Sequence, residues 1–519
     1  MSQLEHTPMD SILAIHDAAR TSFLSHKTRP VSWRLSQLRK LYWALKDNES
    51  AMLEACRLDL GRSEFETYLS EICWCENDIL FMCNNLEKWV KDEKAPDIPL
   101  MNMALSPRIR KEPLGCVLVI GAYNFPIQLT LGPLIGAISA GCTAVVKPSE
   151  NAPHAAAVMQ KIIADALDPS SYAVVQGAIP ETSKLLECKW DKIFYTGNAT
   201  VGTIIAKKAA ETLTPVTLEL GGRNPAIVSA SADPRLAARR LLWAKLLNAG
   251  QVCVSQNYIL VDRSILPALI SEMRTALKEF HPNGAQSSPD YGRIVNSRQF
   301  ERLKKMLDST TGKILIGGTT DAANNFIEPT VIEVESITDP LITDESFGPL
   351  IPILAVADLD EAICVANSIH ETPLGLYPFG TRAEVKKVLD QTRSGGASIN
   401  DGFFHASIPT LAFGGVGDSG QGAYRGKASF DTFTHRRSVT STPGWIEGLL
   451  SVRYPPYAGK LEKFRKQTDL KPNFDRDGRV KIAWTWLALG LGSNSGVGAL
   501  GRWVALMALA LGLRQWTTR

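Results

Sequence analysis

The first candidate for covalent chemistry in this sequence is a cysteine that lies on a turn. In Asn248-Ala-Gly-Gln-Val-Cys253 the thiol follows a Gly-Gln turn and precedes a stretch with the apolar pattern of a strand. A cysteine thiolate is a strong nucleophile. A free cysteine is often only a small buried hydrophobe, so Cys253 by itself leaves a structural role open.

A carboxylate is the second candidate, in Pro215-Val-Thr-Leu-Glu-Leu-Gly-Gly222. Strand alternation puts Leu218 and Leu220 on one face and Glu219 on the other. Glu219 is therefore either a base or part of a solvated strand face. The two glycines that follow allow the backbone to approach another group closely.

An amide is the third candidate, in Gly121-Ala-Tyr-Asn-Phe-Pro126, which follows a short apolar run at residues 116–120. Asn124 would then lie at the carboxyl end of a strand, the edge where open α/β sheets bind ligands. An amide donor at such an edge can stabilise an oxyanion. The alternative is that Asn124 makes a turn with its own backbone.

Alternating strands and helices must position these three residues. Residues 8–94 have the apolar spacing of helices, and a strand, helix, strand order follows at 116–120, 129–140 and 143–146. This order predicts a parallel crossover in a doubly wound sheet. Further short apolar runs continue the first series at residues 173–175 and 193–195, and a second series has runs at 226–228, 258–261, 350–356 and 397–400.

The bulk composition excludes several classes of function. A length of 519 residues predicts two main domains, and a formal charge of +3 without a long basic run gives no reason to expect nucleic acid as a partner. The nine cysteines include no pair of C-x-x-C elements, and the eight histidines have no ligand spacing. We expect no bound metal.

The three segments, in this order, resemble the aldehyde dehydrogenase superfamily over residues 18–439. The glycine-rich segment Phe413-Gly-Gly-Val-Gly-Asp-Ser-Gly420 is most similar to the class 3 branch, which includes the membrane-bound fatty aldehyde dehydrogenases. The resemblance implies a doubly wound dinucleotide-binding domain, an α/β catalytic domain and a small oligomerisation element. Other matching segments are Lys147-Pro-Ser-Glu150, Phe194-Tyr-Thr-Gly197 and Glu345-Ser-Phe-Gly-Pro349.

The resemblance also implies roles for the three residues in an NAD-dependent oxidation of aldehydes to carboxylates. Cys253 would form a thioester, Asn124 and the backbone N–H of Cys253 would receive the oxyanion, and Glu219 would act as general base. A catalytically silent, membrane-bound structural relative and an acylating enzyme that passes its thioester to coenzyme A remain the alternatives.

NAD is the expected cofactor, with NADP possible. By resemblance Lys147 binds the adenosine ribose, and Glu150 beside it would repel a 2′-phosphate. The fingerprint G-x-G-x-x-G is absent; in its place Gly197 and Gly202 flank four residues and would face the pyrophosphate. The remaining residues expected at the cofactor are Gly221, Glu345 and Phe347.

The domain boundaries follow from these assignments. We expect a dinucleotide-binding domain at residues 1–98 and 113–222 and a catalytic domain at 223–428. Residues 99–112 and 429–445 would form the oligomerisation element of a homodimer, with a strand-like hairpin at 99–111. A basic linker at 446–481 would precede an apolar tail at 482–513.

The apolar tail predicts attachment to a membrane. Its two apolar stretches, 482–492 and 497–513, are separated by Ser493-Asn-Ser-Gly496 and flanked by tryptophans, which favour membrane interfaces. Basic residues before the tail place the catalytic domain on the cytosolic side, and the expected membrane is the endoplasmic reticulum. A hairpin in one leaflet, or a buried helix pair that covers the catalytic domain, remains the alternative.

Overall fold

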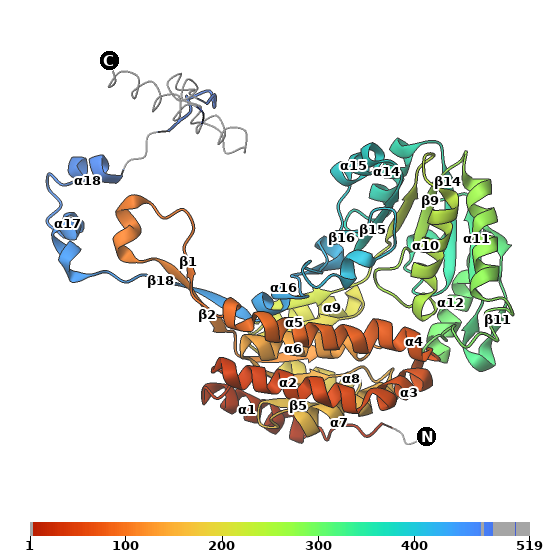
Figure 1. Ribbon diagram of the computed structural model, residues 1–519, viewed down its shortest axis with the longest axis horizontal. Helices are drawn as coiled ribbons and strands as arrows, with labels where there is room; N and C mark the ends of the chain where they lie inside the picture. The colour runs from red at the N-terminus through yellow and green to blue at the C-terminus, as the bar shows by residue number, and fades with distance from the viewer. Residues whose placement is uncertain (1–3, 469–471, 481–503, 505–519) are drawn as a thin grey trace, which may run out of the picture. The chain divides into compact units, whose positions relative to one another are not determined.

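The computed structural model describes residues 4–468, 472–480 and 504. The chain divides into two compact units, one of residues 1–97 and 107–439 and one of residues 98–106 and 440–519. The first unit contains both α/β sheets and the helices around them, as Figure 1 shows. The three candidate residues all belong to this unit.

The first large sheet has six strands in the order β17-β7-β6-β3-β4-β5, parallel except for β17. Every residue of β3 is buried, as expected for an inner parallel strand covered on both faces. The strands are β3 (Cys116–Ile120), β4 (Thr143–Lys147), β5 (Tyr172–Val174), β6 (Lys192–Thr196), β7 (Val216–Glu219) and β17 (Gly420–Gln421). The connecting helices are α6 (Gln128–Ala140), α7 (Pro153–Ala166), α8 (Ile179–Glu187) and α9 (Ala199–Ala210).

Helices cover both faces of this sheet. Val117 of β3 belongs to one core with Leu38 and Leu134, while its neighbour Leu118 belongs to a second core with Ile12 and Leu185. The predicted doubly wound fold is therefore confirmed. The N-terminal helical region consists of α1 (Ser11–Leu24), α2 (Val31–Asp47), α3 (Glu49–Leu60), α4 (Glu64–Thr67), a π-helical turn (Tyr68–Ile72) and α5 (Cys73–Trp89).

The second large sheet has seven strands in the order β10-β13-β14-β9-β8-β15-β16, with only β10 antiparallel. Its strands are β8 (Pro225–Val228), β9 (Tyr258–Asp262), β10 (Lys313–Ile316), β13 (Thr330–Val334), β14 (Leu350–Val356), β15 (Gly375–Phe379) and β16 (Gly396–Ala397). Its helices are α10 (Pro234–Leu246), α11 (Leu266–Phe280), α12 (Ser297–Ser309), α13 (Pro340–Thr343), α14 (Leu359–Ile369) and α15 (Arg382–Gln391).

A third, small sheet pairs β2 (Arg108–Pro113) with β1 (Glu93–Lys94) and β18 (Thr434–Val439), all antiparallel. β18 follows α16 (Lys427–Thr432), and its middle residues are exposed at the sheet edge. Figure 1 shows β2 and β18 side by side. The role of this sheet in a homodimer stays a prediction.

The expected strand-like hairpin at residues 99–111 is wrong for its first half. Leu100–Leu105 forms 3-10 turns, and the strand begins only at Arg108. Ser106 has a left-handed φ of 44°, and Pro107 after it lacks an N–H group for a ladder. The β-strand pairing therefore starts after this break.

The second unit contains short helices at Gly444–Ile446, Glu447–Leu450 (α17), Ser451–Arg453 and Leu461–Thr468 (α18). Among the described residues there is no helix with both the length and the apolar character needed to cross a bilayer. Apart from Val504, the predicted anchor at residues 482–513 lies outside the described residues.

Two glycines of α6 test how tightly this helix packs. A Cβ atom on Gly136 would lie 2.9 Å from the carbonyl oxygen of Ser429, whereas one on Gly132 would meet nothing closer than 3.8 Å. Gly132→Ala should raise the free energy of unfolding by up to about 1 kcal/mol, because alanine favours helix. Gly136→Ala should lower it by about 1 to 3 kcal/mol through overpacking. Urea unfolding of both variants measures the difference, and equal midpoints would contradict the close contact between α6 and α16.

Candidate active site

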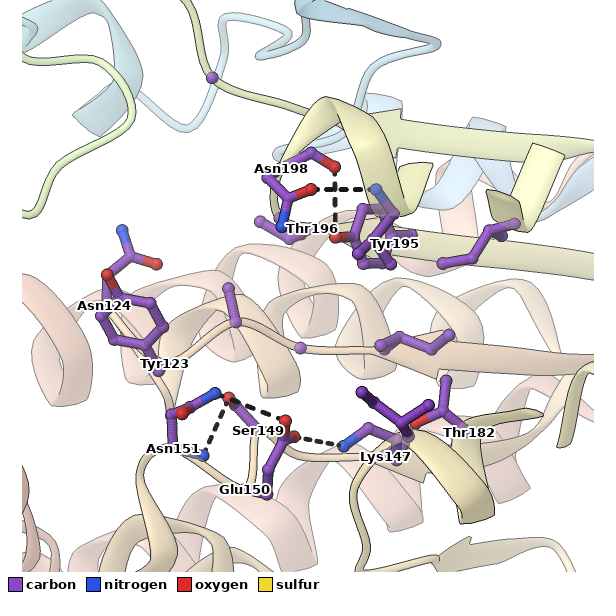
Figure 2. Close-up of a pocket in the computed structure, with 18 of the residues that line it drawn as sticks. Tyr123, Asn124, Lys147, Ser149, Glu150, Asn151, Thr182, Tyr195, Thr196 and Asn198 are labelled. Carbon is purple, nitrogen blue, oxygen red and sulfur yellow. Dashed lines mark hydrogen bonds and ion pairs between the residues drawn. The ribbon is translucent and has the colours of Figure 1, made fainter. Parts of the chain in front are cut away.

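A cavity of about 710 Å³ lies at the carboxyl ends of β3, β4, β6 and β7, and loops and helix α12 around the second sheet line its other side. Its size falls in the usual range for small-molecule sites. Nine of the predicted site residues line it: Asn124, Lys147, Glu150, Gly197, Glu219, Gly221, Cys253, Glu345 and Phe347. Figure 2 shows the side formed by the first sheet.

Gly202 is the one predicted site residue that does not line the cavity. A Cβ atom there would lie 2.9 Å from Cδ2 of Leu220, so this glycine lets α9 approach the end of β7. Gly197 does line the cavity, just before α9. Asn198 caps that helix by accepting a hydrogen bond from the N–H of Val201 at 2.9 Å.

Cys253 lies in the loop between Gly250 and β9 and is partly buried. Burial, and then the carboxylates of Glu345 and Glu219, raise the pKa of its thiol to about 12. Its backbone carbonyl accepts a hydrogen bond from Nδ2 of Asn224 at 2.8 Å. The thiol is therefore neutral in this cavity until a base or a nearby positive charge stabilises its thiolate.

Glu219 is the last residue of β7 and is buried. Neither of its carboxylate oxygens has a hydrogen-bond partner among the described residues. Burial alone raises the pKa of Glu219 well above its usual range. The interpretation as a solvated strand face is therefore wrong, and a buried carboxyl group without partners in a cavity is typical of a functional site.

Asn124 is buried and connects two loops rather than closing its own turn. Its side-chain Nδ2 donates to the carbonyl oxygen of Gln251 at 3.1 Å. Its own backbone carbonyl accepts hydrogen bonds from Arg62 at 2.5 Å and from Asn248 at 2.7 Å. The loop after β3 is therefore tied directly to the loop that carries Cys253.

Lys147 and Glu150 form an ion pair of 3.0 Å at the end of β4, visible in Figure 2. The ammonium group of Lys147 also donates to the carbonyl oxygens of Pro148 and Gly177. Glu150 is about one third exposed to the cavity. Glu150 can accept a hydrogen bond from a sugar hydroxyl, whereas Lys147 can donate to one only by giving up one of its three acceptors.

The loop from Glu345 to Gly348 forms the opposite wall. Burial raises the pKa of Glu345 to about 7. The backbone N–H of Gly222 and the charges of Lys245 and Arg302 lower that pKa, but their effect is smaller. A Cβ atom on Gly221 would lie 2.4 Å from Oε2 of Glu345, so the predicted close approach of this glycine to another group is confirmed.

Two arginines of α12, Arg298 and Arg302, also line the cavity, and the sequence analysis missed both. Arg302 donates to the carbonyl oxygens of Glu345 and Ser346. Their spacing of four residues on one helix face was the available signal. The donors and acceptors around this cavity fit a nicotinamide dinucleotide, because positive groups suit its phosphates and carboxylates suit its sugar hydroxyls. No group of three metal-ligating side chains occurs in the part of the chain that the structure describes.

Comparison with known proteins agrees with this site. The model of the aldehyde dehydrogenase family matches residues 2–439. The beta-apo-4'-carotenal oxygenase of Neurospora crassa is 53% identical over 98% of this chain and 96% of its own. Aldehyde dehydrogenase family 3 member B1 of Bos taurus is 42% identical, covering 86% and 95%.

Two further similarities concern assembly and fold. A Canis lupus familiaris protein named aldehyde dehydrogenase, dimeric NADP-preferring, is 41% identical over 88% of this chain and 100% of its own. The substrate-bound structure of Staphylococcus aureus AldH has a TM-score of 0.85 and 40% identity, covering 88% and 99%. The expected resemblance is confirmed: this chain belongs to the aldehyde dehydrogenase family, the NAD(P)-dependent enzymes that oxidise aldehydes, and its relatives include family 3 members.

Proposed function

We propose that this chain oxidises extended apolar aldehydes, in the first place medium- to long-chain fatty aldehydes, to carboxylates through a thioester on Cys253. The observation that carries the proposal is that Cys253, Glu219 and Asn124 line one cavity together with Lys147 and Glu345. A nucleophile, a base and an oxyanion donor are the groups that acyl transfer requires.

The first half of the proposed reaction forms a carbon–sulfur bond. The Cys253 thiol gives its proton to water, the resulting thiolate attacks the carbonyl carbon, and the carbonyl oxygen becomes an alkoxide. The amide of Asn124, which has a second N–H besides the one bonded to Gln251, and the N–H of Cys253 stabilise that oxygen. A nicotinamide dinucleotide held by Lys147, Glu150 and Glu345 would supply the hydride acceptor, so that the carbon bonded to Cys253 loses a hydride and a thioester remains.

The second half breaks the thioester with water. Glu219 takes one proton from the water as its oxygen adds to the thioester carbon, the carbon–sulfur bond breaks, and the Cys253 thiolate leaves. The carboxylic acid that forms gives its remaining proton to solvent and departs as the carboxylate. The base must be ionised, and burial raises the pKa of Glu219. Hydrolysis should therefore be fast above that raised pKa and fall as the pH is lowered through it.

The surroundings of Cys253 support an apolar substrate. Cys253 belongs to a cluster whose buried members are Phe125, Leu129, Val252, Val254 and Leu374, with Phe403 and Phe413 beside them. Phe403 and Phe413, which stay partly exposed, are the members that a hydrocarbon chain would cover, with a gain of about 0.8 kcal/mol for each CH₂ group removed from water. The name of the Neurospora crassa relative makes a conjugated apo-carotenoid aldehyde the second candidate substrate.

NAD is the proposed preferred cofactor. Lys147 and Glu150 would bind a ribose hydroxyl, and the charge of Glu150 would repel a 2′-phosphate. Gly197, Gly221, Glu345 and Phe347 would hold the rest of the dinucleotide, with Gly202 acting only through the position of α9. Because the relative from Canis lupus familiaris is named NADP-preferring, NADP is the competing cofactor in this proposal.

Assembly and attachment complete the proposal. A homodimer is supported by the exposed edge of β18 and by the dimeric relative from Canis lupus familiaris. The apolar segment 482–513 would anchor the enzyme to the endoplasmic reticulum, with the catalytic domain cytosolic and the substrate drawn from the bilayer.

Glu219→Gln tests the division of labour between base and nucleophile. Premixed with NAD and a fatty aldehyde, the variant should give a burst of about one NADH per site and then turn over at least about a hundredfold more slowly than wild type. Stopped-flow absorbance at the NADH band measures both phases. Cys253→Ala is the control and should give no burst.

Two outcomes would contradict this assignment. Loss of the burst in Glu219→Gln would mean that the carboxylate activates Cys253 instead. Full recovery of its steady turnover on addition of coenzyme A, with wild type also releasing an acyl-coenzyme A, would identify an acylating enzyme in which Glu219 is dispensable.

Glu150→Gln tests the cofactor preference. Wild type should have a lower KM for NAD than for NADP. The ratio of the KM for NADP to the KM for NAD should fall about tenfold in the variant, because one charge that repels the 2′-phosphate is removed. Steady-state kinetics with both cofactors measure the ratio. Glu187→Gln, which removes an exposed carboxylate of α8 away from the cavity, should leave it unchanged. Equal KM values in wild type would refute the preference.

Removal of the tail tests the attachment. A chain ending at Pro472 should be recovered in the soluble fraction and oxidise a short aldehyde at the wild-type rate. With vesicles that contain saturated aldehydes of two to about twenty carbons or a polyene aldehyde, the full chain should exceed the truncated chain most for the longest substrates. Release of the full chain from membranes by carbonate would refute the anchor.

A further inference from the structure

Arg62 is a fully buried guanidinium that belongs to none of the motifs described above. It follows α3 and donates to four groups: the backbone carbonyl of Asn124 at 2.5 Å, Oε1 of Glu71 at 2.7 Å, Oδ1 of Asn248 at 3.3 Å and Oγ of Ser70 at 3.5 Å. It also lies 5.0 Å from the ring centre of Phe125. One side chain thus contacts both loops that supply the proposed oxyanion donors.

Glu71 fixes the guanidinium and the start of α6 at the same time. Its second oxygen, Oε2, accepts hydrogen bonds from the N–H groups of Ile127 and Gln128 at 3.0 and 2.8 Å. Glu71 belongs to the π-helical turn Tyr68–Ile72, and such turns occur often at functional sites. The Arg62–Glu71 ion pair therefore fixes both ends of the segment 124–128: Arg62 binds the carbonyl of Asn124, and Glu71 binds the N–H groups of Ile127 and Gln128.

Asn248 extends the same network to the loop of Cys253. Its Nδ2 donates to the carbonyl oxygens of Asn124 and Gln251 at 2.7 and 3.1 Å, and its backbone N–H donates to Glu66. Gln251 is also the residue whose carbonyl accepts the amide of Asn124. The side-chain amide of Asn124 is therefore oriented by the Gln251 carbonyl, which Asn248 also contacts, while Arg62 and Asn248 fix the backbone that carries it at the Asn124 carbonyl.

We propose that Arg62 is a positioning residue that orients the side-chain amide of Asn124 toward the oxygen of the reacting aldehyde. The inference rests on the proposed oxyanion role of Asn124. Arginine is required because its planar fork reaches Asn124, Glu71 and Asn248 at once, whereas the compact ammonium group of lysine cannot match that geometry. Burial of the charge is made possible by Glu71 and Glu66, whose side chains lie 2.7 and 3.9 Å from it.

Arg34 provides a matched control. It is buried in the same unit and its guanidinium donates to three groups, the carbonyls of Thr28, Arg29 and Ser139. None of these residues lines the cavity. Arg34→Lys therefore measures how much kcat falls when a buried guanidinium loses its hydrogen bonds at a place outside the cavity.

The test is a double-mutant cycle with Arg62→Lys and Asn124→Ala. Arg62→Lys should lower kcat about tenfold and Asn124→Ala about a hundredfold, and the double variant should match Asn124→Ala alone. The KM for NAD should change less than twofold. Alkylation of Cys253 by iodoacetamide, which forms no oxyanion, should keep its wild-type rate and pH dependence in Arg62→Lys. Arg34→Lys should leave kcat within twofold.

Several results would overturn the inference. Three results would each assign Arg62 a merely structural role. The first is a tenfold loss of kcat on Arg62→Lys that persists in the Asn124→Ala background. The others are an equal loss of the alkylation rate in Arg62→Lys and an equal loss of kcat in Arg34→Lys. A wild-type kcat in Asn124→Ala would instead refute the oxyanion role itself. If Arg62→Lys does not fold, Glu71→Gln releases Arg62 from its ion pair and enters the same cycle with the same expectations.

Discussion

The backbones of Gly250 and Gly348 approach so closely that a Cβ atom on Gly250 would lie 2.3 Å from the carbonyl carbon of Gly348. Gly250 has a φ of 80°, so glycine is required there both for space and for conformation. This contact joins the loop of Cys253 to the loop of Glu345. The position of both side chains in one cavity depends on it.

Strain in the flanking residues shows what holds this contact together. Asn248, Ala249 and Phe347 all have φ near 50°, which is costly for residues other than glycine. The strain persists because buried hydrogen bonds fix both loops. The backbone N–H of Ser346 donates to Asn257, its carbonyl accepts from Arg302, and Asn248 is held by Arg62 and Glu66. These hydrogen bonds thus stabilise a backbone conformation that the local sequence alone would not adopt.

The local parts of this structure could be predicted from the sequence. β3 and β14 have the predicted bounds, and α6 begins one residue earlier than predicted, because continuous apolar runs and helical spacing are local signals. β15 was missed because it contains Gly375 and Pro378, which rarely occur inside strands. Arg62 and Glu71 were missed because they meet the site only through the fold, far along the chain from Asn124 and Asn248.

The central claim is that an acyl group passes through Cys253, and intact-protein mass spectrometry tests it most directly. Wild-type enzyme mixed with NAD and excess aldehyde, and quenched with acid within one turnover, should gain the mass of the aldehyde less two hydrogen atoms. Peptide mapping should locate this mass on Cys253 and not on the exposed Cys364. NADH production without any such adduct, or with the adduct on another cysteine, would contradict the account.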